Sequence, residues 1–294
     1  MDKSDNKNYT VARESDGTIQ ITFTIAKEEV LKNQAKVIED LGKEVEVPGF
    51  RKGNAPADKV KEYLPNEKVI EKTLSLILPK MLAFALSEEK IRPSIYPKFE
   101  VLSATENEDW QVRAIMCEIP SFELGDYKKN IKGLLNAGKI WTPDNKDDPE
   151  KPKEPTRAEK EQKIIYYLLQ NINLIIPRIL IEEEVNSRLS QLLARIEKLG
   201  LTLEGYLSSI GKTPQSLREE YSKQSQEAIK IELILEKVSI SENIQVADTE
   251  IDQAVSASST DPTIQKNLNS PEQRNLIKTI LARRKALDFL LTLL

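Results

Sequence analysis

The sequence predicts an α+β domain built on an antiparallel sheet, followed by an all-helical domain. Apolar and polar residues alternate strictly from Ile19 to Ile25, which is typical of a half-buried antiparallel strand. Segments with strand and helix patterns come in the order strand, strand, helix, helix, strand, strand, which favours an α+β arrangement. From about Arg157 to the end, the apolar residues are spaced helically throughout.

The first two strands are predicted as a hairpin over residues 9–26. A short strand begins at Tyr9, and Asp16-Gly17 is a strong signal for a hairpin turn. The alternating strand comes next, and helical spacing then covers 28–41.

The second half of this domain is predicted as two helices and two closing strands. A short helix over 57–64 ends at Pro65, and Asn66 is suited to cap a longer helix that runs to about residue 90. Pro79 lies inside that helix and predicts a kink or a break. Apolar residues at 99–101 and 110–116 predict the strands that complete the sheet.

Three parts are therefore expected, with boundaries at 1–133, 134–156 and 157–294. The middle part contains a stretch of Pro, Asp, Glu and Lys with almost no apolar residues, which is typical of an extended linker. The last part is expected to hold helices separated by Gly200 and Gly211, with Thr213 or Ser216 as the cap of the long helix that follows. Ser270-Pro271 predicts the start of the final helix.

Composition excludes several classes of function. The formal net charge is −4, so any contact with nucleic acid must be local, and aromatic residues at 5% are too few for a single-strand stacking platform. There is no histidine, and the single Cys117 rules out an internal disulfide and a cysteine-based zinc site. We therefore expect neither catalytic residues nor a metal nor a cofactor.

Membrane insertion is also not expected. The first residues lack the apolar core of a signal peptide, and no later segment is long and apolar enough to span a bilayer. These features predict a cytoplasmic protein.

The most informative segment is Val47-Pro48-Gly49-Phe50-Arg51-Lys52-Gly53-Asn54-Ala55-Pro56. Its two glycines allow backbone angles that other residues avoid, and the two prolines restrict how the chain enters and leaves. An aromatic residue beside two cations is poor material for a core but well suited to an anionic, partly apolar surface. The segment is predicted to be a tight, exposed loop that includes Gly49, Phe50, Arg51, Lys52, Gly53 and Pro56.

This loop resembles the ribosome-docking signature of the trigger factor family of bacterial chaperones. The resemblance covers residues 8–133, and Asn54 stands where the family often has a lysine. A second resemblance covers 157–294. It includes Ile176-Pro177 with Leu180-Ile181-Glu182-Glu183-Glu184-Val185, and Gly200-Leu201-Thr202-Leu203-Glu204-Gly205-Tyr206-Leu207 followed by Gly211-Lys212-Thr213 and Leu217-Arg218-Glu219-Glu220.

The resemblance implies a ribosome-binding α+β domain and a two-armed helical chaperone domain. Its expected partners are the large ribosomal subunit, through an exit-site protein and nearby rRNA, and unfolded or nascent polypeptides; a weak homodimer is left open. The family's prolyl isomerase domain needs on the order of a hundred residues. Only a charged linker lies between Gly133 and Arg157, so a holdase without isomerase activity is expected.

Arms that extend from a body cannot bury both faces, so part of their apolar stripe is expected to contact clients. The candidate residues lie along the predicted arm helices and are Leu189, Leu193, Ile196, Tyr206, Leu207, Leu217 and Ile231.

Three alternatives remain open at this point. The first is a similar helical holdase that works away from the ribosome on exported or extracytoplasmic clients. The second is a prolyl isomerase, and the third is an assembly factor with one dedicated partner.

Overall fold

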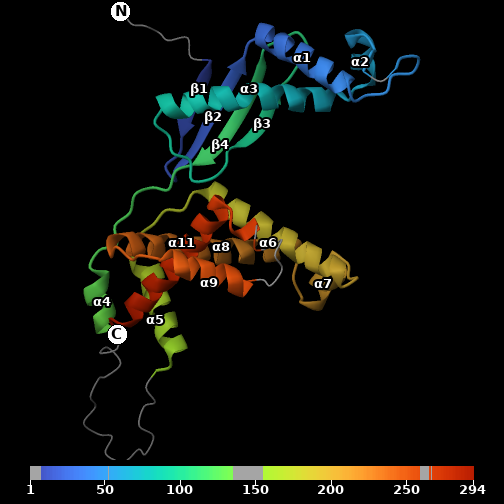
Figure 1. Cartoon of the computed structure of the whole chain (residues 1–294). Helices are drawn as coiled ribbons and strands as arrows, with labels where there is room; N and C mark the ends of the chain where they lie inside the picture. The colour runs from blue at the N-terminus through green and yellow to red at the C-terminus, as the bar shows by residue number, and fades with distance from the viewer. Residues whose placement is uncertain (1–7, 52, 135–154, 259–264, 266) are drawn as a thin grey trace, which may run out of the picture. The chain divides into compact units, whose positions relative to one another are not determined.

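The computed structural model describes residues 8–51, 53–134, 155–258, 265 and 267–294 of the 294-residue chain. Its contacts divide the chain into two compact units (Figure 1). The first consists of Met1–Pro120 with Pro177–Leu180, and the second of Ser121–Ile176 with Ile181–Leu294.

The described residues of the first unit form a four-stranded antiparallel sheet in the order β1-β2-β4-β3. The strands are β1 (Tyr9–Arg13), β2 (Thr18–Ile25), β3 (Lys98–Ser103) and β4 (Trp110–Cys117). The predicted hairpin and both closing strands are confirmed. The alternation in β2 places Ile21, Phe23 and Ile25 fully in the core, while the threonines between them are partly exposed.

Three helices complete this unit: α1 (Lys27–Gly42), α2 (Ala57–Tyr63) and α3 (Asn66–Glu88). Figure 1 shows α3 lying across one face of the sheet. Its residues Leu74, Ile77 and Leu78 join the buried core of β2 and β4. The helix continues through Pro79 without a break.

The predicted cap of α3 is wrong. Asn66 is already the first helical residue, Pro65 occupies the cap position, and no side chain caps the helix. The helix begins one residue earlier than predicted, so Asn66 lies in its first turn and not at the cap position.

The second unit is helical in its described residues. Its helices are α4 (Tyr127–Gly133), α5 (Arg157–Asn171), α6 (Arg178–Lys198), α7 (Leu203–Ser209), α8 (Pro214–Ser241), α9 (Asp248–Ser258) and α11 (Pro271–Leu291). The predicted start of the last helix is confirmed, because the Ser270 hydroxyl accepts a hydrogen bond from the Gln273 amide.

The helices α4, α5, α8 and α11 contribute buried residues to the core of this unit. It contains Tyr127, Ile131, Ile164, Leu168, Ile172, Ile234, Leu235, Val238, Ala286 and Leu290. The apolar residues at the C-terminal end of the chain, including Leu293 and Leu294, pack partly against it. Across the described residues, no helix is both long and apolar enough to cross a membrane.

The structural division differs from the boundary expected at 133. Helix α4 lies before that boundary, yet Tyr127 and Ile131 are buried in the core of the helical unit. The division falls at Pro120 because the apolar face of α4 packs into the core of the helical unit and not against the sheet. Most of the expected linker, residues 135–154, lies outside the described residues.

Candidate functional site

The loop between α1 and α2 is anchored by a small core of its own. Val47 before the loop and Val60 after it are buried in a cluster with Val37 and Leu41 of α1 and Leu64 after α2. Because both ends of the loop are attached to this cluster, its entry and exit are held by burial while the segment between them faces solvent.

Two consecutive tight turns shape the loop. The Phe50 amide donates to the Val47 carbonyl at 3.0 Å, and Gly49, the third residue of that turn, has φ of +87°. With Pro48 in the second position, this is the pattern of a type II turn. The Asn54 amide donates to the Arg51 carbonyl at 2.9 Å, and Gly53 has φ of +83°. The two glycines are therefore required by the backbone.

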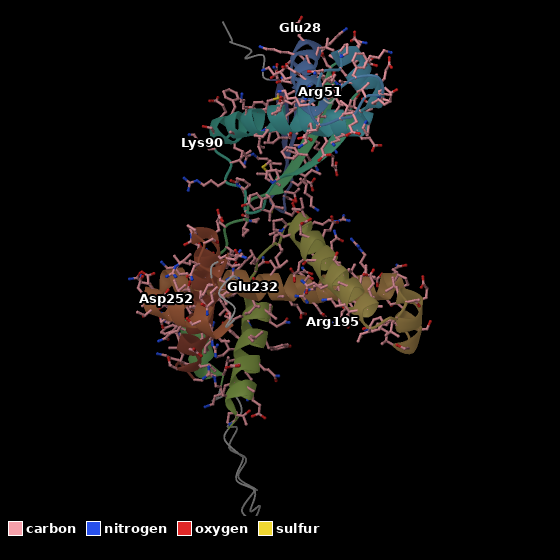
Figure 2. The ribbon with its side chains drawn as sticks, turned by 45° about the vertical axis from the view of Figure 1, so that its right-hand side comes forward. Glu28, Arg51, Lys90, Arg195, Glu232 and Asp252 are labelled. Carbon is pink, nitrogen blue, oxygen red and sulfur yellow. The ribbon has the colours of Figure 1, made fainter. Side chains whose placement is uncertain are left out.

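This geometry leaves Phe50 and Arg51 between the turns. The Phe50 side chain is 44% exposed although it is large and apolar. Arg51 is exposed and has no ion-pair partner among the described residues, and Figure 2 shows it among the side chains beside α1 and α2. Gly49, Gly53 and Pro56 are also exposed, whereas Lys52 lies outside the described residues.

The predicted arm corresponds to α6, α7 and α8. In Figure 1, α7 lies at the far end of α6 and α8, away from α4 and α5. The end of α6 is a Schellman cap: the Leu201 amide donates to the Ile196 carbonyl at 3.1 Å and the Gly200 amide to the Glu197 carbonyl at 2.9 Å. Gly200 has φ of +70°, so the reversal of the chain is set by a glycine.

The end of α7 repeats this cap. The Lys212 amide donates to the Leu207 carbonyl at 3.0 Å, and Gly211 has φ of +64°. Gly200 and Gly211, one on each side of α7, thus produce the turn of the arm and define where the chain returns along α8.

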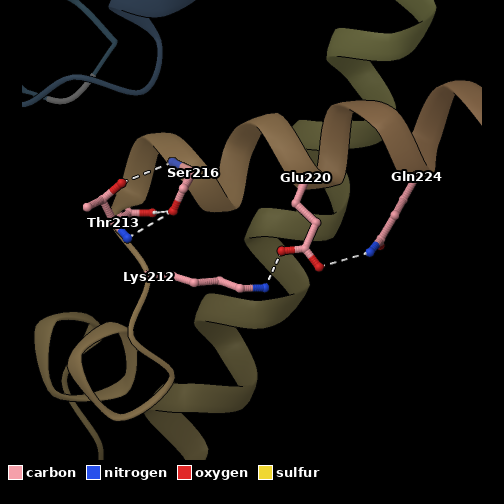
Figure 3. A network of polar contacts seen from close by, with 5 residues as sticks. All are labelled: Lys212, Thr213, Ser216, Glu220 and Gln224. Carbon is pink, nitrogen blue, oxygen red and sulfur yellow. Dashed lines mark hydrogen bonds and ion pairs between the residues drawn. The ribbon is translucent and has the colours of Figure 1, made fainter.

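A polar network holds the return (Figure 3). Thr213 and Ser216 form a capping box, in which the Ser216 amide donates to Thr213 Oγ1 at 3.1 Å and the Thr213 amide to Ser216 Oγ at 3.0 Å. Of the two predicted caps, Thr213 is the capping residue. Lys212 pairs with Glu220, which also accepts a hydrogen bond from Gln224. The network ties the segment after α7 to the first turns of α8.

The candidate client residues divide by exposure. The buried ones are Ile196, Leu207 and Leu217, at 3%, 5% and 4% exposure. The expectation that these side chains face a client is wrong for the folded chain, because all three are buried. Leu193 is exposed at 39%, and the half-buried ones are Leu189, Tyr206 and Ile231.

Three exposed apolar residues at the end of the arm were missed. Leu199 is 69% exposed, Leu201 is 51% and Ile210 is 38%. All three flank the cap glycines, Gly200 and Gly211. The sequence carried no signal for their exposure, because an apolar residue after a cap glycine usually packs against the last turn of the helix.

The groups with a shifted pKa do not form a reaction centre. Burial raises the pKa of the Cys117 thiol to about 11, which makes it a poor nucleophile. Burial and then the hydrogen bond to Glu242 raise the pKa of Tyr127 to about 12. In the described parts of the chain, carboxylates and Cys117 do not gather into a metal-binding group.

Comparison with protein families matches almost all of the chain. Residues 7–133 match the model described as "Bacterial trigger factor protein (TF)", and residues 148–292 match "Bacterial trigger factor protein (TF) C-terminus". Trigger factor of Streptococcus agalactiae serotype Ia is 34% identical over 108 residues, which is 37% of this chain and 25% of the relative. Trigger factor of Lactobacillus gasseri is 33% identical over 109 residues, again 37% of this chain and 24% of the relative.

A similar solved structure is described as "Promiscuous Substrate Recognition in Folding and Assembly Activities of the Trigger Factor Chaperone". It aligns with a TM-score of 0.58 at 14% identity and covers 97% of this chain and 99% of its own, which shows a common fold. The matched region spans about a quarter of the length of the curated relatives. The two family matches and the α+β and helical units agree, and the chain belongs to the bacterial trigger factor family.

Proposed function

We propose that this chain is an ATP-independent, ribosome-associated chaperone that holds newly made polypeptides and lacks prolyl isomerase activity. The observation that carries the proposal is the loop at 47–54. Two glycine turns on an anchored base present a half-exposed Phe50 and Arg51, which has no ion-pair partner in the described part of the chain. Membership in the trigger factor family supports the large ribosomal subunit near the polypeptide exit as the proposed partner of this loop, and the cytoplasm as the proposed location.

The chemistry of the loop suits a mixed surface of protein and rRNA. Arg51 can make bidentate contacts with a phosphate or a carboxylate, and Phe50 can bury its ring against an apolar patch. Few charges take part, so the binding would be weak, reversible and sensitive to salt.

The proposed client surface is the exposed apolar group at the end of the arm, Leu193, Leu199, Leu201 and Ile210. Leu189, Tyr206 and Ile231 extend it along the helices, half-buried. Separate apolar side chains surrounded by charged neighbours favour weak contact with many sequences over tight contact with one.

The lack of isomerase activity is proposed from chain length. Only residues 134–147 separate the two family matches. A domain with its own core needs at least about 50 residues. The proposal therefore expects no acceleration of proline-limited refolding, and a clear acceleration by the purified chain would contradict it.

Ribosome co-sedimentation at low and moderate salt tests the docking loop. The triple variant Phe50→Ala, Arg51→Ala, Lys52→Ala is expected to lose binding. A matched control, Tyr96→Ala, Arg92→Ala, Lys68→Ala, removes an exposed aromatic residue and two exposed cations elsewhere in the first unit and is expected to bind normally.

Suppression of client aggregation tests the arm separately. Leu199→Ser with Leu201→Ser is expected to protect a denatured client less well, whereas Leu31→Ser, at an exposed site of the first unit, is not. Full client protection without any ribosome binding by the wild-type chain would favour the alternative, a ribosome-independent holdase for exported or extracytoplasmic clients.

A further inference from the structure

Two rows of apolar side chains cross the sheet from β2 through β4 and end on the edge strand β3. One row runs from Ile21 through Ala114 to Phe99, and its exposure changes from 0% and 0% to 43%. The other runs from Phe23 through Val112 and ends at Val101, which is 49% exposed. Helix α3 covers the inner strands but leaves these last members open, so each row stops where one more strand would complete it.

The space beside these side chains is a groove between α3 and β3, which we call the α3–β3 groove. Its volume is about 720 Å³, within the range of roughly 300–1,000 Å³ for ligand sites. The lining residues are Glu67, Ile70, Glu71, Leu74, Ser75, Leu78, Pro79, Phe99 and Val101. Its floor is apolar, because Leu74 and Leu78 belong to the buried core and the two β3 side chains form the opposite wall.

The rim of the groove is acidic. Glu67 and Glu71 lie one helical turn apart on α3, so both carboxylates are on the same side of the helix. Both are exposed, and neither has an ion-pair partner among the described residues. No lysine or arginine lines the groove. A ligand that carries a cation at this position would gain two attractive contacts without displacing an existing one.

Strand β3 adds a backbone template. It pairs only with β4 within the described sheet, and its other edge is open. An open edge strand with exposed apolar residues is the usual site at which an extended peptide adds as a further strand. In such a peptide, every second side chain would enter the groove and continue the rows that end at Phe99 and Val101.

From these observations we propose that the α3–β3 groove binds an extended, basic segment of an unfolded polypeptide as an added strand on β3. Alternate apolar side chains fill the groove, and a lysine or arginine at its mouth faces Glu67 and Glu71. The proposal deepens the proposed chaperone function and rests on it, because it assigns to the first unit a second client contact that is independent of the arm.

Fluorescence anisotropy with the full chain tests this directly. The probe is a labelled peptide of alternating valine and lysine, compared with its valine–glutamate counterpart and with a valine–lysine peptide N-methylated on the backbone. The valine–lysine peptide is expected to bind, and its affinity to fall with salt. The other two are expected to bind weakly, because one reverses the charge and the other removes the backbone donors.

Variants identify the site. Glu67→Gln with Glu71→Gln should weaken the valine–lysine peptide about three- to tenfold. The control pair Glu28→Gln with Glu29→Gln makes the same change in net charge on α1, outside the groove, and should have no effect. Val101→Ser should weaken all peptide binding, whereas Leu76→Ser, also exposed but outside the groove, should not.

The outcomes separate this proposal from the chaperone function itself. Loss of peptide binding in Leu199→Ser with Leu201→Ser, and not in the groove variants, would overturn the groove and leave the arm as the client site. A concentration-dependent dimer in sedimentation equilibrium that Val101→Ser abolishes would show that a second copy occupies β3, and would overturn it as well. Full client protection without any binding of the valine–lysine peptide would overturn the proposal for the α3–β3 groove but not the proposed chaperone function.

Discussion

Tyr127 donates its phenolic proton to Glu242 at 2.6 Å and so joins α4 to the residue that caps the end of α8. Lys128 donates to the other oxygen of the same carboxylate at 2.7 Å. Both donors act on Glu242, which lies 115 positions after Tyr127 and 114 after Lys128 in the sequence. This contact, with the burial of Tyr127 and Ile131, is what places residues 121–134 in the helical unit.

Tyr127→Phe is expected to reduce the stability of the helical unit by about 0.5–1.5 kcal/mol at neutral pH, because Glu242 loses one donor. The variant should also change the alkaline behaviour. Folded Tyr127 keeps its proton up to about pH 12, whereas an ordinary tyrosine releases it near pH 10, so the folded state binds more protons in this window.

The free energy of unfolding of the wild-type chain should therefore fall as pH rises from 10 to about 12, and Tyr127→Phe should remove this component. The slope contributed by one such group is at most ~1.4 kcal/mol per pH unit. Urea unfolding followed by circular dichroism at several pH values measures it. Tyr166→Phe, at a 68% exposed position, is the control, and an equal loss there would contradict the assignment.

Gly49→Ala and Gly53→Ala are expected to weaken ribosome binding although neither removes an aromatic or charged group. No atom lies within 4 Å of a Cβ at Gly49, so the effect comes from the positive φ and not from a clash. The strain of about 1–2 kcal/mol per residue should be relieved by a changed turn, which moves Phe50 and Arg51. Co-sedimentation measures this, with Gly133→Ala as a control; normal binding by both loop variants would show that the turns do not matter.

Asn54→Lys is expected to strengthen ribosome binding at low salt. Asn54 is exposed, directly after Gly53, so an added cation would extend the positive charge of the loop. An exposed charge contact is worth about 0.2–1 kcal/mol, which corresponds to a gain of up to about fivefold. The gain should shrink at moderate salt, and Asn54→Gln should show none. An equal gain at both salt levels would argue against an electrostatic cause.

Leu207→Ala and Leu199→Ala should separate packing from client contact. Leu207 is 5% exposed, and truncation there should cost about 2–5 kcal/mol of stability. Leu199 is 69% exposed, so Leu199→Ala should leave stability within about 0.5 kcal/mol while lowering protection of a denatured client. Unfolding curves and aggregation assays on both variants measure the two effects; a stable Leu207→Ala would contradict the burial of the arm's turn.

Local patterns predicted most of the secondary structure. The alternation from Ile19 to Ile25 became β2, and the helix over 28–41 became α1, one residue longer at each end. Thr213 and the cap glycines were recognisable because capping depends on a few neighbouring residues. Asn66 was misplaced because proline before it already occupied the start of the helix.

The exposure of the arm residues was less predictable. A helical stripe such as Leu189, Leu193 and Ile196 shows that one face of α6 is apolar, but not where another segment covers it. Burial of Ile196 beside exposed Leu193 depends on how the chain folds after Gly200. The exposure of Phe99 and Val101 could likewise not be predicted from the sequence, because a strand has the same pattern whether or not a helix covers it.

Periodicity, capping residues and composition were enough to predict most helices and strands, the α+β and all-helical fold class, and the loop that carries Phe50 and Arg51. Each of these features depends on residues that are close together in the sequence. Long-range packing decided three other matters: the placement of α4 with the helical unit, the burial of Leu207 and Leu217, and the open groove beside β3. These depend on contacts between segments tens of residues apart, and the hydrophobic effect that drives such contacts is not directional, so the same apolar residue can satisfy it in more than one place.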